Sequence, residues 1–262
     1  MPITAGIDIG SLTTKCAFYD GEKMIGYFIS RSGHEFERIG GEVYEKALNQ
    51  SNLNKDDINF IMGTGYGRYS IPFADGTITE ISAHARGVNF LLGDEVRTII
   101  DIGGQDSKGI SVGKNGKVLD FVMNDKCAAG TGRFIEVMAN ALKVGHISEM
   151  GPISLKSKKP SNISSMCTVF AESEIISLFA SGIQKEDIIS GIHKAIVKRI
   201  VGMVKRIKIQ PALAFCGGVA KNIGVKKAIK DELKMDVLVP DEPQIPGALG
   251  AAIIAYEKLE KS

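Results

Sequence analysis

Apolar residues recur along the chain in short runs that predict β-strands. Turn-forming residues bound these runs, and two hairpin signals, Asp20-Gly21 and Asn115-Gly116, fall between neighbouring runs. The six predicted strands are residues 3–9, 16–19, 24–30, 98–102, 110–112 and 118–123. They form two sets of three, and each set opens with a strand that ends in Asp-Ile-Gly and leads into a polar turn with a lysine. This repetition predicts two related lobes, each beginning with an antiparallel three-stranded unit.

Other stretches place apolar residues three or four positions apart, which is the spacing of one face of an α-helix. One stripe consists of Phe134, Val137, Met138, Ala141 and Leu142, and another of Ile175, Ile176, Phe179, Ala180 and Ile183. The other predicted helices are residues 39–51, 80–92 and 186–207, and a last helix that opens at 247 with residues small enough for close packing. Further strands are predicted from 60, ahead of a glycine-rich loop, and at 212–215 and 237–240.

Proline and glycine near Gly93 and in residues 241–246 mark the predicted boundaries between the lobes. We expect residues 1–93 and 247–262 to form the first lobe, because the C-terminal helix is expected to return to it. Residues 94–246 would form the second lobe. The mixture of strands and helices predicts an α/β fold.

Charge and composition exclude several classes of function. The 262 residues include 32 basic and 30 acidic side chains, for a net charge of +2, which gives no support for binding to nucleic acid or to a membrane surface. The first residues lack the basic and apolar regions of a signal peptide, and no run of about 18 apolar residues occurs. We therefore expect a cytoplasmic protein.

The cysteines and histidines show no spacing typical of a zinc site or of a disulfide framework, because no C-x-x-C pair occurs. Each of the four histidines is expected to be a surface residue or a satisfied core residue; they are His34, His84, His146 and His193. Cys16 lies in a predicted strand and Cys216 beside a glycine turn, so we expect both to be packed thiols.

Cys127 stands in a small, glycine-rich stretch, Asn-Asp-Lys-Cys-Ala-Ala-Gly-Thr-Gly-Arg-Phe, ahead of the helix that contains Phe134. This position predicts a cysteine at a helix N-terminus. Unpaired N–H groups and the helix dipole there favour an anion, such as a thiolate, a phosphate or a thiolate-bound metal cluster. The alternative is a thiol packed beside a tight turn. Cys167 also precedes a predicted helix.

Four turns carry the chemistry of a nucleotide site. The first, residues 8–15, puts Asp8 at a strand end, followed by glycine, hydroxyls and Lys15. Backbone N–H groups of such a turn can hold phosphates while the carboxylate holds a hydrated magnesium ion. It is not a P-loop, since G-x-x-x-x-G-K-[ST] is missing from the sequence. The other three turns are residues 101–105, 215–220 and 247–250.

In this order, the four turns resemble the nucleotide-binding signature of the actin, sugar-kinase and heat-shock-70 superfamily. The resemblance implies two ribonuclease-H-like lobes, built from duplicated βββαβαβα units, that clamp Mg-ATP or ADP. It implies that Asp8 and Asp101 hold magnesium and its waters and that Gln105 orients the attacking water. The nucleotide-binding residues that it implies are Gly10, Ser11, Leu12, Thr13, Thr14, Lys15, Gly103, Gly104, Gly217, Gly218, Val219, Asn222 and Gln244.

Residues 124–134 together with residues 167–174 resemble the activator family of the 2-hydroxyacyl-CoA dehydratases. That family includes ATPase subunits of benzoyl-CoA reductase and reductases of double-cubane iron–sulfur proteins. Residues 64–68 and 247–252 also fit, so that the resemblance spans essentially the whole chain. It implies a homodimer that shares one [4Fe-4S] cluster, with Cys127 and Cys167 of each subunit as ligands.

The resemblance also implies an activity, in which ATP hydrolysis drives a low-potential electron to a dehydratase or a double-cubane protein. Ferredoxin or flavodoxin would supply the electron. A cubane needs four thiolates and one chain offers two cysteines ahead of helices, which agrees with a shared site. Two alternatives stay open at this point: a small-molecule kinase of the same superfamily, and a non-catalytic, nucleotide-sensing protein of the actin class.

Overall fold

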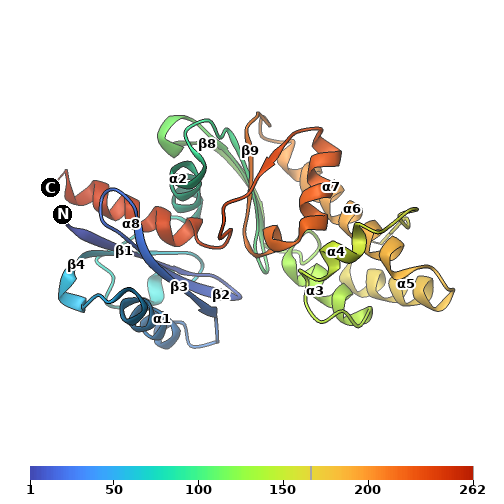
Figure 1. The fold of residues 1–262 in the computed structure, drawn as a ribbon, viewed down its shortest axis with the longest axis horizontal. Helices are drawn as coiled ribbons and strands as arrows, with labels where there is room; N and C mark the ends of the chain where they lie inside the picture. The colour runs from blue at the N-terminus through green and yellow to red at the C-terminus, as the bar shows by residue number, and fades with distance from the viewer. Residues whose placement is uncertain (166, 262) are drawn as a thin grey trace. The chain divides into compact units, whose positions relative to one another are not determined.

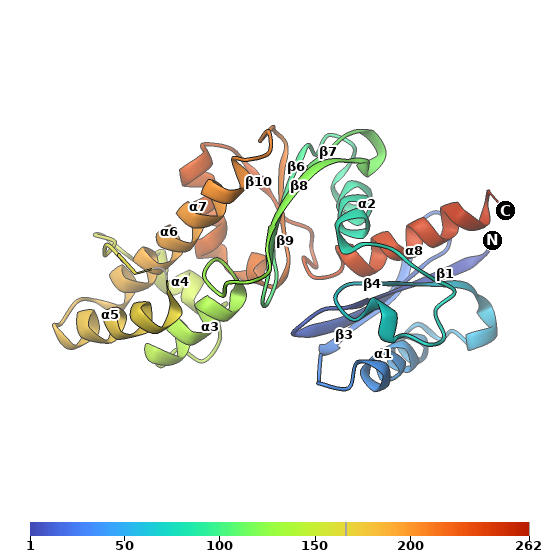
Figure 2. The ribbon, with the colours of Figure 1, turned by 180° about the vertical axis from the view of Figure 1, so that it is seen from behind.

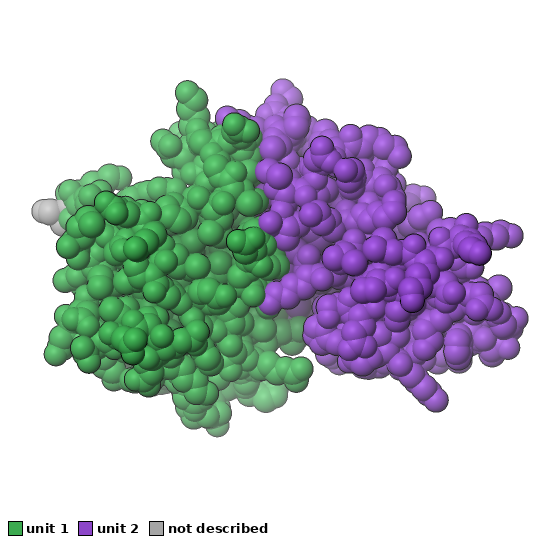
Figure 3. Space-filling view, in the orientation of Figure 1, with its two compact units in different colours: residues 1–96, 112–119, 240–262 green, residues 97–111, 120–239 purple. Residues whose placement is uncertain are grey.

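Two mixed five-stranded sheets, each with its own helices, form the framework of the protein (Figure 1; seen from behind in Figure 2). The structure is a computed structural model that describes residues 1–165 and 167–261. The chain divides into two compact units (Figure 3). Unit 1 comprises Met1–Val96, Val112–Leu119 and Pro240–Ser262, and unit 2 comprises Arg97–Ser111 and Asp120–Val239.

The first sheet has the strand order β3-β2-β1-β4-β5. Its strands are β1 (Ile3–Ile9), β2 (Thr13–Tyr19), β3 (Met24–Arg31), β4 (Ile58–Thr64) and β5 (Gly76–Thr77). β1 pairs antiparallel with β2 and parallel with β4. The helices of this part of the chain are α1 (Phe36–Ser51), α2 (Glu80–Leu92) and α8 (Pro246–Leu259).

Helices cover both faces of the first sheet. In β2, Cys16 and Phe18 pack in the core with α1, whereas Ala17 and Tyr19 pack in the core with α8. This alternation explains why the strand reads as a continuous apolar run, because successive side chains point to opposite faces and both faces are buried. The small residues predicted at the start of α8 allow a close approach to α2. A Cβ atom on Gly250 would lie 1.8 Å from the carbonyl oxygen of Ala83, so only glycine fits there.

The second sheet repeats the topology of the first, with the order β10-β9-β6-β7-β8. Its strands are β6 (Thr98–Ile102), β7 (Ser107–Val112), β8 (Val118–Asn124), β9 (Leu213–Cys216) and β10 (Val237–Leu238). The β6 strand pairs antiparallel with β7 and parallel with β9, as β1 does with β2 and β4. The α/β fold of two ribonuclease-H-like lobes that the sequence predicts is confirmed.

Five helices complete unit 2: α3 (Gly132–Ala141), α4 (Met150–Ser154), α5 (Thr168–Ala180), α6 (Lys185–Val204) and α7 (Ile223–Leu233). Short 3₁₀ turns lie at Lys55–Asp57, Arg68–Ser70, Lys114–Gly116 and Gly218–Lys221. The core of this unit joins Phe134 of α3, Ile196 of α6 and Phe215 of β9. Within residues 1–165 and 167–261, the helices are all too short or too polar to cross a lipid bilayer.

Three predicted details are wrong. β2 begins at Thr13 rather than at Cys16, because Thr13–Lys15 continue the pairing with β1 and β3. The helix after Cys127 begins only at Gly132. The apolar stripe predicted for α5 is packed only in part, because Ile175 is buried while Ile176 and Phe179 are exposed. These apolar residues do have helical spacing, but most of them face away from the core of unit 2.

Candidate functional site

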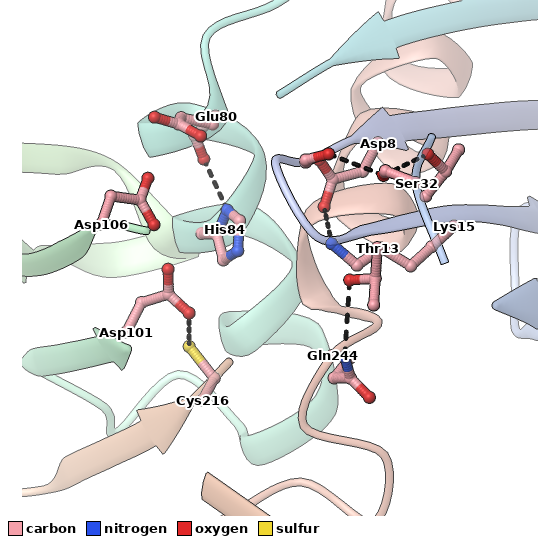
Figure 4. A network of polar contacts seen from close by, with 12 residues as sticks. Asp8, Thr13, Lys15, Ser32, Glu80, His84, Asp101, Asp106, Cys216 and Gln244 are labelled. Carbon is pink, nitrogen blue, oxygen red and sulfur yellow. Dashed lines mark hydrogen bonds and ion pairs between the residues drawn. The ribbon is translucent and has the colours of Figure 1, made fainter. Parts of the chain in front are cut away.

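A buried ion pair stands at the end of β1. Asp8 is 2% exposed, and Lys15 Nζ donates to Asp8 Oδ2 at 3.0 Å (Figure 4). The two residues are direct partners in the β1–β2 register, so the hairpin itself aims the lysine at the carboxylate. Charged side chains are seldom buried unless they are paired, and this pair meets that requirement.

Ser32, the residue that directly follows β3, stabilises the turn between β1 and β2. Ser32 Oγ donates to the Gly10 carbonyl at 2.7 Å, and the Ser32 N–H donates to the Leu12 carbonyl at 2.9 Å. Since the one hydroxyl hydrogen of Ser32 is used, Thr14 Oγ1 donates to Ser32 Oγ at 2.8 Å. Thr14 is fully buried and supports the turn, whereas Leu12 at its tip is exposed. No local motif marks Ser32 as part of this turn, because it lies 22 residues from Gly10 along the chain.

Gln244 reaches the same turn. Its Nε2 donates to Thr13 Oγ1 at 3.5 Å, which is the longest of the polar contacts here (Figure 4). Both residues belong to unit 1. The structure therefore brings two of the predicted nucleotide-binding residues together, although they are far apart in the sequence.

Unit 2 repeats the carboxylate–lysine pair at the end of β6. Asp101 is 2% exposed, and Lys108 Nζ lies 3.2 Å from Asp101 Oδ2 and 2.6 Å from Asp106 Oδ2. Asp101 and Lys108 are register partners in β6 and β7, as Asp8 and Lys15 are in β1 and β2. Lys108 and Asp106 were not among the predicted site residues. Lys108 could have been found from its position, because it follows Asp101 at the same separation in the sequence at which Lys15 follows Asp8.

A neighbouring strand adds a thiol to the second pair. Cys216 Sγ donates to Asp101 Oδ1 at 3.5 Å (Figure 4). Burial raises the pKa of the Cys216 thiol, and the negative charge of Asp101 raises it further. Cys216 is therefore a proton-bearing donor at neutral pH, not a thiolate.

Each carboxylate also has a glycine in the left-handed region beside it, at the end of the adjacent parallel strand. Gly65 has φ +84° and Gly217 has φ +85°. A Cβ atom on Gly65 would lie 2.3 Å from Asp8 Oδ1, and one on Gly217 would lie 2.6 Å from Asp101 Oδ1. Only glycine allows the backbone this close to the carboxylate. The two units thus carry the same arrangement of aspartate, lysine and glycine.

Each of the two carboxylates, taken by itself, suits a hydrated magnesium ion. No group of three or more histidine, cysteine, aspartate or glutamate side chains gathers in the described ranges 1–165 and 167–261. Magnesium usually keeps several waters and takes one or two carboxylates together with phosphate oxygens. Asp8 and Asp101, each held by a lysine, suit that mode of binding.

The second glycine turn is joined to the start of α3. The Gly132 N–H donates to the Gly103 carbonyl at 2.9 Å, and the Arg133 N–H donates to the Gly104 carbonyl at 2.8 Å. A Cβ atom on Gly132 would lie 2.9 Å from that Gly103 oxygen, so a larger residue would push the helix away from the turn. Gln105 lies at the tip of the same turn and is exposed.

The two predicted ligand cysteines are exposed, and the other two are buried. The prediction that Cys16 and Cys216 are packed thiols is confirmed. Burial raises the pKa of the Cys16 thiol, which keeps it protonated. Cys167 is the N-cap residue of α5, as predicted. Cys127 is not at a helix N-terminus, since Thr131 is the N-cap of α3 and a turn separates the two.

Asn222, predicted to bind the nucleotide, also caps the start of α7. It is fully buried, and its Oδ1 accepts from the N–H groups of Gly224 and Val225 at the start of α7. Its Nδ2 donates to the Ile147 carbonyl at 2.7 Å and to His193 Nε2 at 3.2 Å. All four hydrogen-bonding positions of its side-chain amide are used within the protein, so a contact with a nucleotide would have to come from its backbone or from the face of the amide. The sequence could not show this, because the partners come from three separate segments.

The same contacts define the state of His193. Because Nε2 accepts from Asn222, the proton of the neutral ring is on Nδ1, which has no hydrogen-bond partner among the residues that the structure describes. Burial lowers the pKa of His193 from 6.5 to about 4. His193 is thus a neutral core residue at physiological pH.

His193 should make the stability of the protein depend on pH. In the unfolded chain the ring binds a proton near pH 6.5, and in the folded chain only near pH 4. The stabilisation is complete above pH 6.5 and is lost as the pH falls towards 4, by about 3 kcal/mol. We expect His193→Gln to remove this part of the difference in unfolding free energy between pH 6.5 and pH 4, as measured by urea denaturation. His34→Gln, at an exposed position, is the control. An unchanged pH difference in His193→Gln would contradict the assignment.

The chain is similar to known proteins over nearly its whole length. Residues 5–255 match the BadF/BadG/BcrA/BcrD ATPase family. A 2-hydroxyisocaproyl-CoA dehydratase activator of Clostridioides difficile is 46% identical over 260 residues, which cover 99% of this chain and 97% of that protein.

Two solved structures are also similar. Component A of the (R)-2-hydroxyglutaryl-CoA dehydratase of Acidaminococcus fermentans has a TM-score of 0.94 at 41% identity, covering 99% of this chain and 100% of that one. The activator of the 2-hydroxyisocaproyl-CoA dehydratase from Clostridium difficile, with bound ADPNP, has a TM-score of 0.93 at 46% identity, covering 99% and 96%. The chain, with its duplicated aspartate–lysine–glycine sites, therefore belongs to the BadF/BadG/BcrA/BcrD ATPase family.

Proposed function

We propose that this protein is an ATP-hydrolysing [4Fe-4S] reductase that passes a low-potential electron to a partner iron–sulfur enzyme. The observation that carries the proposal is the hydrogen-bonded connection between the second glycine turn, at Gly103 and Gly104, and the helix that follows the exposed Cys127. A turn suited to phosphate and a cysteine suited to a metal cluster are thereby parts of one continuous segment of unit 2.

The nucleotide is proposed to use both repeated turns. The turns of residues 10–15 and 103–105 would hold the phosphates, and Gly217, Gly218, Val219 and Asn222 would lie along the nucleoside with Gln244. Magnesium, when bound, would offset the charge that develops on the phosphates. Asp8 and Asp101 would hold its waters, and Gln105 would orient the attacking water. We assign residues 1–93 and 247–262 to the lobe of the first turn and 94–246 to the lobe of the second.

Lys15 and Lys108 have a supporting role in this scheme. Each holds one oxygen of its aspartate, so that the carboxylate keeps a single orientation without nucleotide. A preorganised charge does not have to reorient during the reaction, and this is the main source of electrostatic stabilisation in enzymes.

The two exposed cysteines are proposed as cluster ligands. Iron–sulfur clusters are held by four thiolates, and one chain supplies two, so a closed site needs a second copy related by a two-fold axis. The helices that follow the two cysteines, α3 and α5, pack against each other. A cluster bound by Cys127 and Cys167 would therefore be joined to the phosphate turn through α3.

An exposed apolar face on α5 supports the proposed homodimer. It begins two residues after Cys167 with Val169 and Phe170, each 67% exposed, and continues through Ile176 and Phe179 to Ile183, which follows the helix. Apolar side chains gathered on one exposed face commonly mark a site of association. A second copy of this chain would cover this face at the same place where its cysteines complete the cluster.

The names of similar proteins indicate the class of partner enzyme that we propose. Similar proteins carry the names of activators of 2-hydroxyisocaproyl-CoA and lactoyl-CoA dehydratases and of a benzoyl-CoA reductase subunit. We propose a 2-hydroxyacyl-CoA dehydratase or a double-cubane protein as the acceptor, and ferredoxin or flavodoxin as the donor.

Anaerobic purification tests this function directly. We expect a brown dimer with four irons per dimer, slow ATP hydrolysis, and oxidation of its reduced cluster that becomes faster when an acceptor dehydratase and ATP are added together. ADPNP in place of ATP should support at most one transfer, because it is not hydrolysed. A colourless protein that phosphorylates a sugar or an acid would instead identify a kinase, and a colourless protein without ATP turnover would identify a nucleotide sensor.

A further inference from the structure

The turn that carries Cys127 is held by side chains from two other elements. All three carbonyls from Cys127 to Ala129 accept hydrogen bonds from unit 2. Asn124 Nδ2, at the end of β8, donates to the Cys127 carbonyl at 2.8 Å and to the Ala129 carbonyl at 3.1 Å. Both partners are oxygens, so the orientation of the amide is settled and both of its hydrogens are used.

Arg199, on α6, also forms a hydrogen bond to the turn. Its Nε donates to the Ala129 carbonyl at 3.0 Å, across 70 residues of sequence. Its Cδ lies 3.6 Å from the position of a Cβ on Gly130, which has φ +94°. The guanidinium therefore lies along the inner edge of the turn. The third carbonyl, that of Ala128, accepts from Thr131 N at 3.0 Å and Thr131 Oγ1 at 2.7 Å.

This arrangement decides which polar groups the turn presents. Its carbonyl oxygens are turned into unit 2, whereas no hydrogen bond among residues 1–165 and 167–261 takes the N–H groups of Cys127 and Ala128. A turn whose carbonyls are engaged and whose N–H groups are open favours an anion beside it. The positive charge of Arg199 acts in the same direction. Neither residue was singled out by the sequence patterns.

We propose that Asn124 and Arg199 are positioning residues that hold the Cys127 turn in the conformation that a thiolate-bound cluster requires. The inference rests on the proposed function for the identity of the cluster, but the hold on the turn is a property of the chain itself. Arg199 is exposed, so its truncation opens no cavity in the core and should leave the fold intact.

Hydrogen exchange of the full-length, metal-free protein tests the hold on the turn without any cluster. We expect Arg199→Ala to speed exchange of the Thr131, Gly132 and Arg133 amides by about threefold or more. These N–H groups are hydrogen-bonded at the end of the turn, and the variant loses a charge-assisted bond that holds it. The control Lys198→Ala removes the neighbouring exposed charge on the same helix and should leave this segment unchanged. Equal exchange rates in Arg199→Ala and Lys198→Ala would overturn the proposal.

Asn124→Asp gives a second, isosteric test. It replaces two donated hydrogen bonds by a carboxylate facing two carbonyl oxygens, so exchange of the same three amides, in residues 131–133, should rise more than in Arg199→Ala. Asp125→Asn, at the exposed neighbouring position, is its control. Exchange in Asn124→Asp no faster than in Asp125→Asn would also overturn the proposal.

A reduction potential separates positioning from simple structural support. In protein reconstituted with iron and sulfide, Arg199→Ala should lower the cluster potential, because a positive charge near the reduced cluster is lost, and Arg199→Lys should restore part of it. A potential equal to that of the wild type in both variants would refute the positioning role. If the wild type bound no cluster, the proposed function would fail, yet the exchange experiments would still decide whether the turn is held.

Discussion

Cys127→Ser is expected to leave the dimer without its [4Fe-4S] cluster. A neutral hydroxyl is a poor ligand for iron in a cubane, and on a two-fold axis one substitution removes two of the four thiolates. The visible absorbance and the iron content of the anaerobically reconstituted protein should fall by about tenfold or more. Cys167→Ser should have the same effect, because the two cysteines are proposed to contribute equally.

Controls for this experiment come from the same chain. Cys16→Ala alters a thiol that is fully buried among core residues of unit 1, so it should keep the full iron content. Binding of ATP to Cys127→Ser should be retained, because the carboxylate–lysine pairs lie on other segments. A full complement of iron in Cys127→Ser would show that the thiol is not a ligand.

Asp101→Asn is expected to reduce ATP hydrolysis by about a hundredfold or more, because a metal-organising charge in such a site is worth several kcal/mol to the transition state. The fold should tolerate the change. Lys108 keeps Asp106 as a partner at 2.6 Å, and Cys216 can still donate to the amide oxygen. Steady-state ATPase assays with magnesium in excess, together with a thermal unfolding curve, measure both effects.

Asp8→Asn is the matched comparison, since the two aspartates have equivalent positions in the two sheets. It should also suppress hydrolysis, but it should cost more stability, about 3 kcal/mol. The reason is that Lys15 has no second carboxylate partner within residues 1–165 and 167–261, whereas Lys108 has one. If both variants hydrolysed ATP at the wild-type rate, the proposed role of the two carboxylates would be wrong. If Asp101→Asn unfolded more readily than Asp8→Asn, the difference in pairing would not govern stability.

Much of the fold was accessible from the sequence, because burial on both faces makes a strand continuously apolar and burial on one face makes a helix periodic. The strands β1 and β6 with their Asp-Ile-Gly ends are examples, and so is the equal spacing from each aspartate to a lysine. The α5 helix is an exception. Its apolar positions have helical spacing, yet much of that face is exposed, because periodicity reports that a face is apolar and not what covers it.

The site was predictable to a similar extent. A glycine turn at a strand end is a local signal, so Asp8, Asp101 and their turns could be found from short motifs. The internal contacts of Asn222 were not predictable, because a motif position does not reveal that four polar partners already use the amide. Cys127 was placed too close to α3, since the pattern of apolar residues shows where a helix packs but not where its first turn begins.

By itself, the sequence determined the two sets of strands, the duplicated aspartate and lysine positions, and the two cysteines free of any local partner, because each of these depends on residue types at short separations. Only the tertiary structure decided that Gly103 and Gly104 hold the start of α3, and that Arg199 from α6 holds the Cys127 turn. These contacts join segments that are far apart along the chain, and the distance between such segments depends on how sheets and helices pack. No local pattern encodes that distance, because any one helix or strand has many faces and registers in which it could pack.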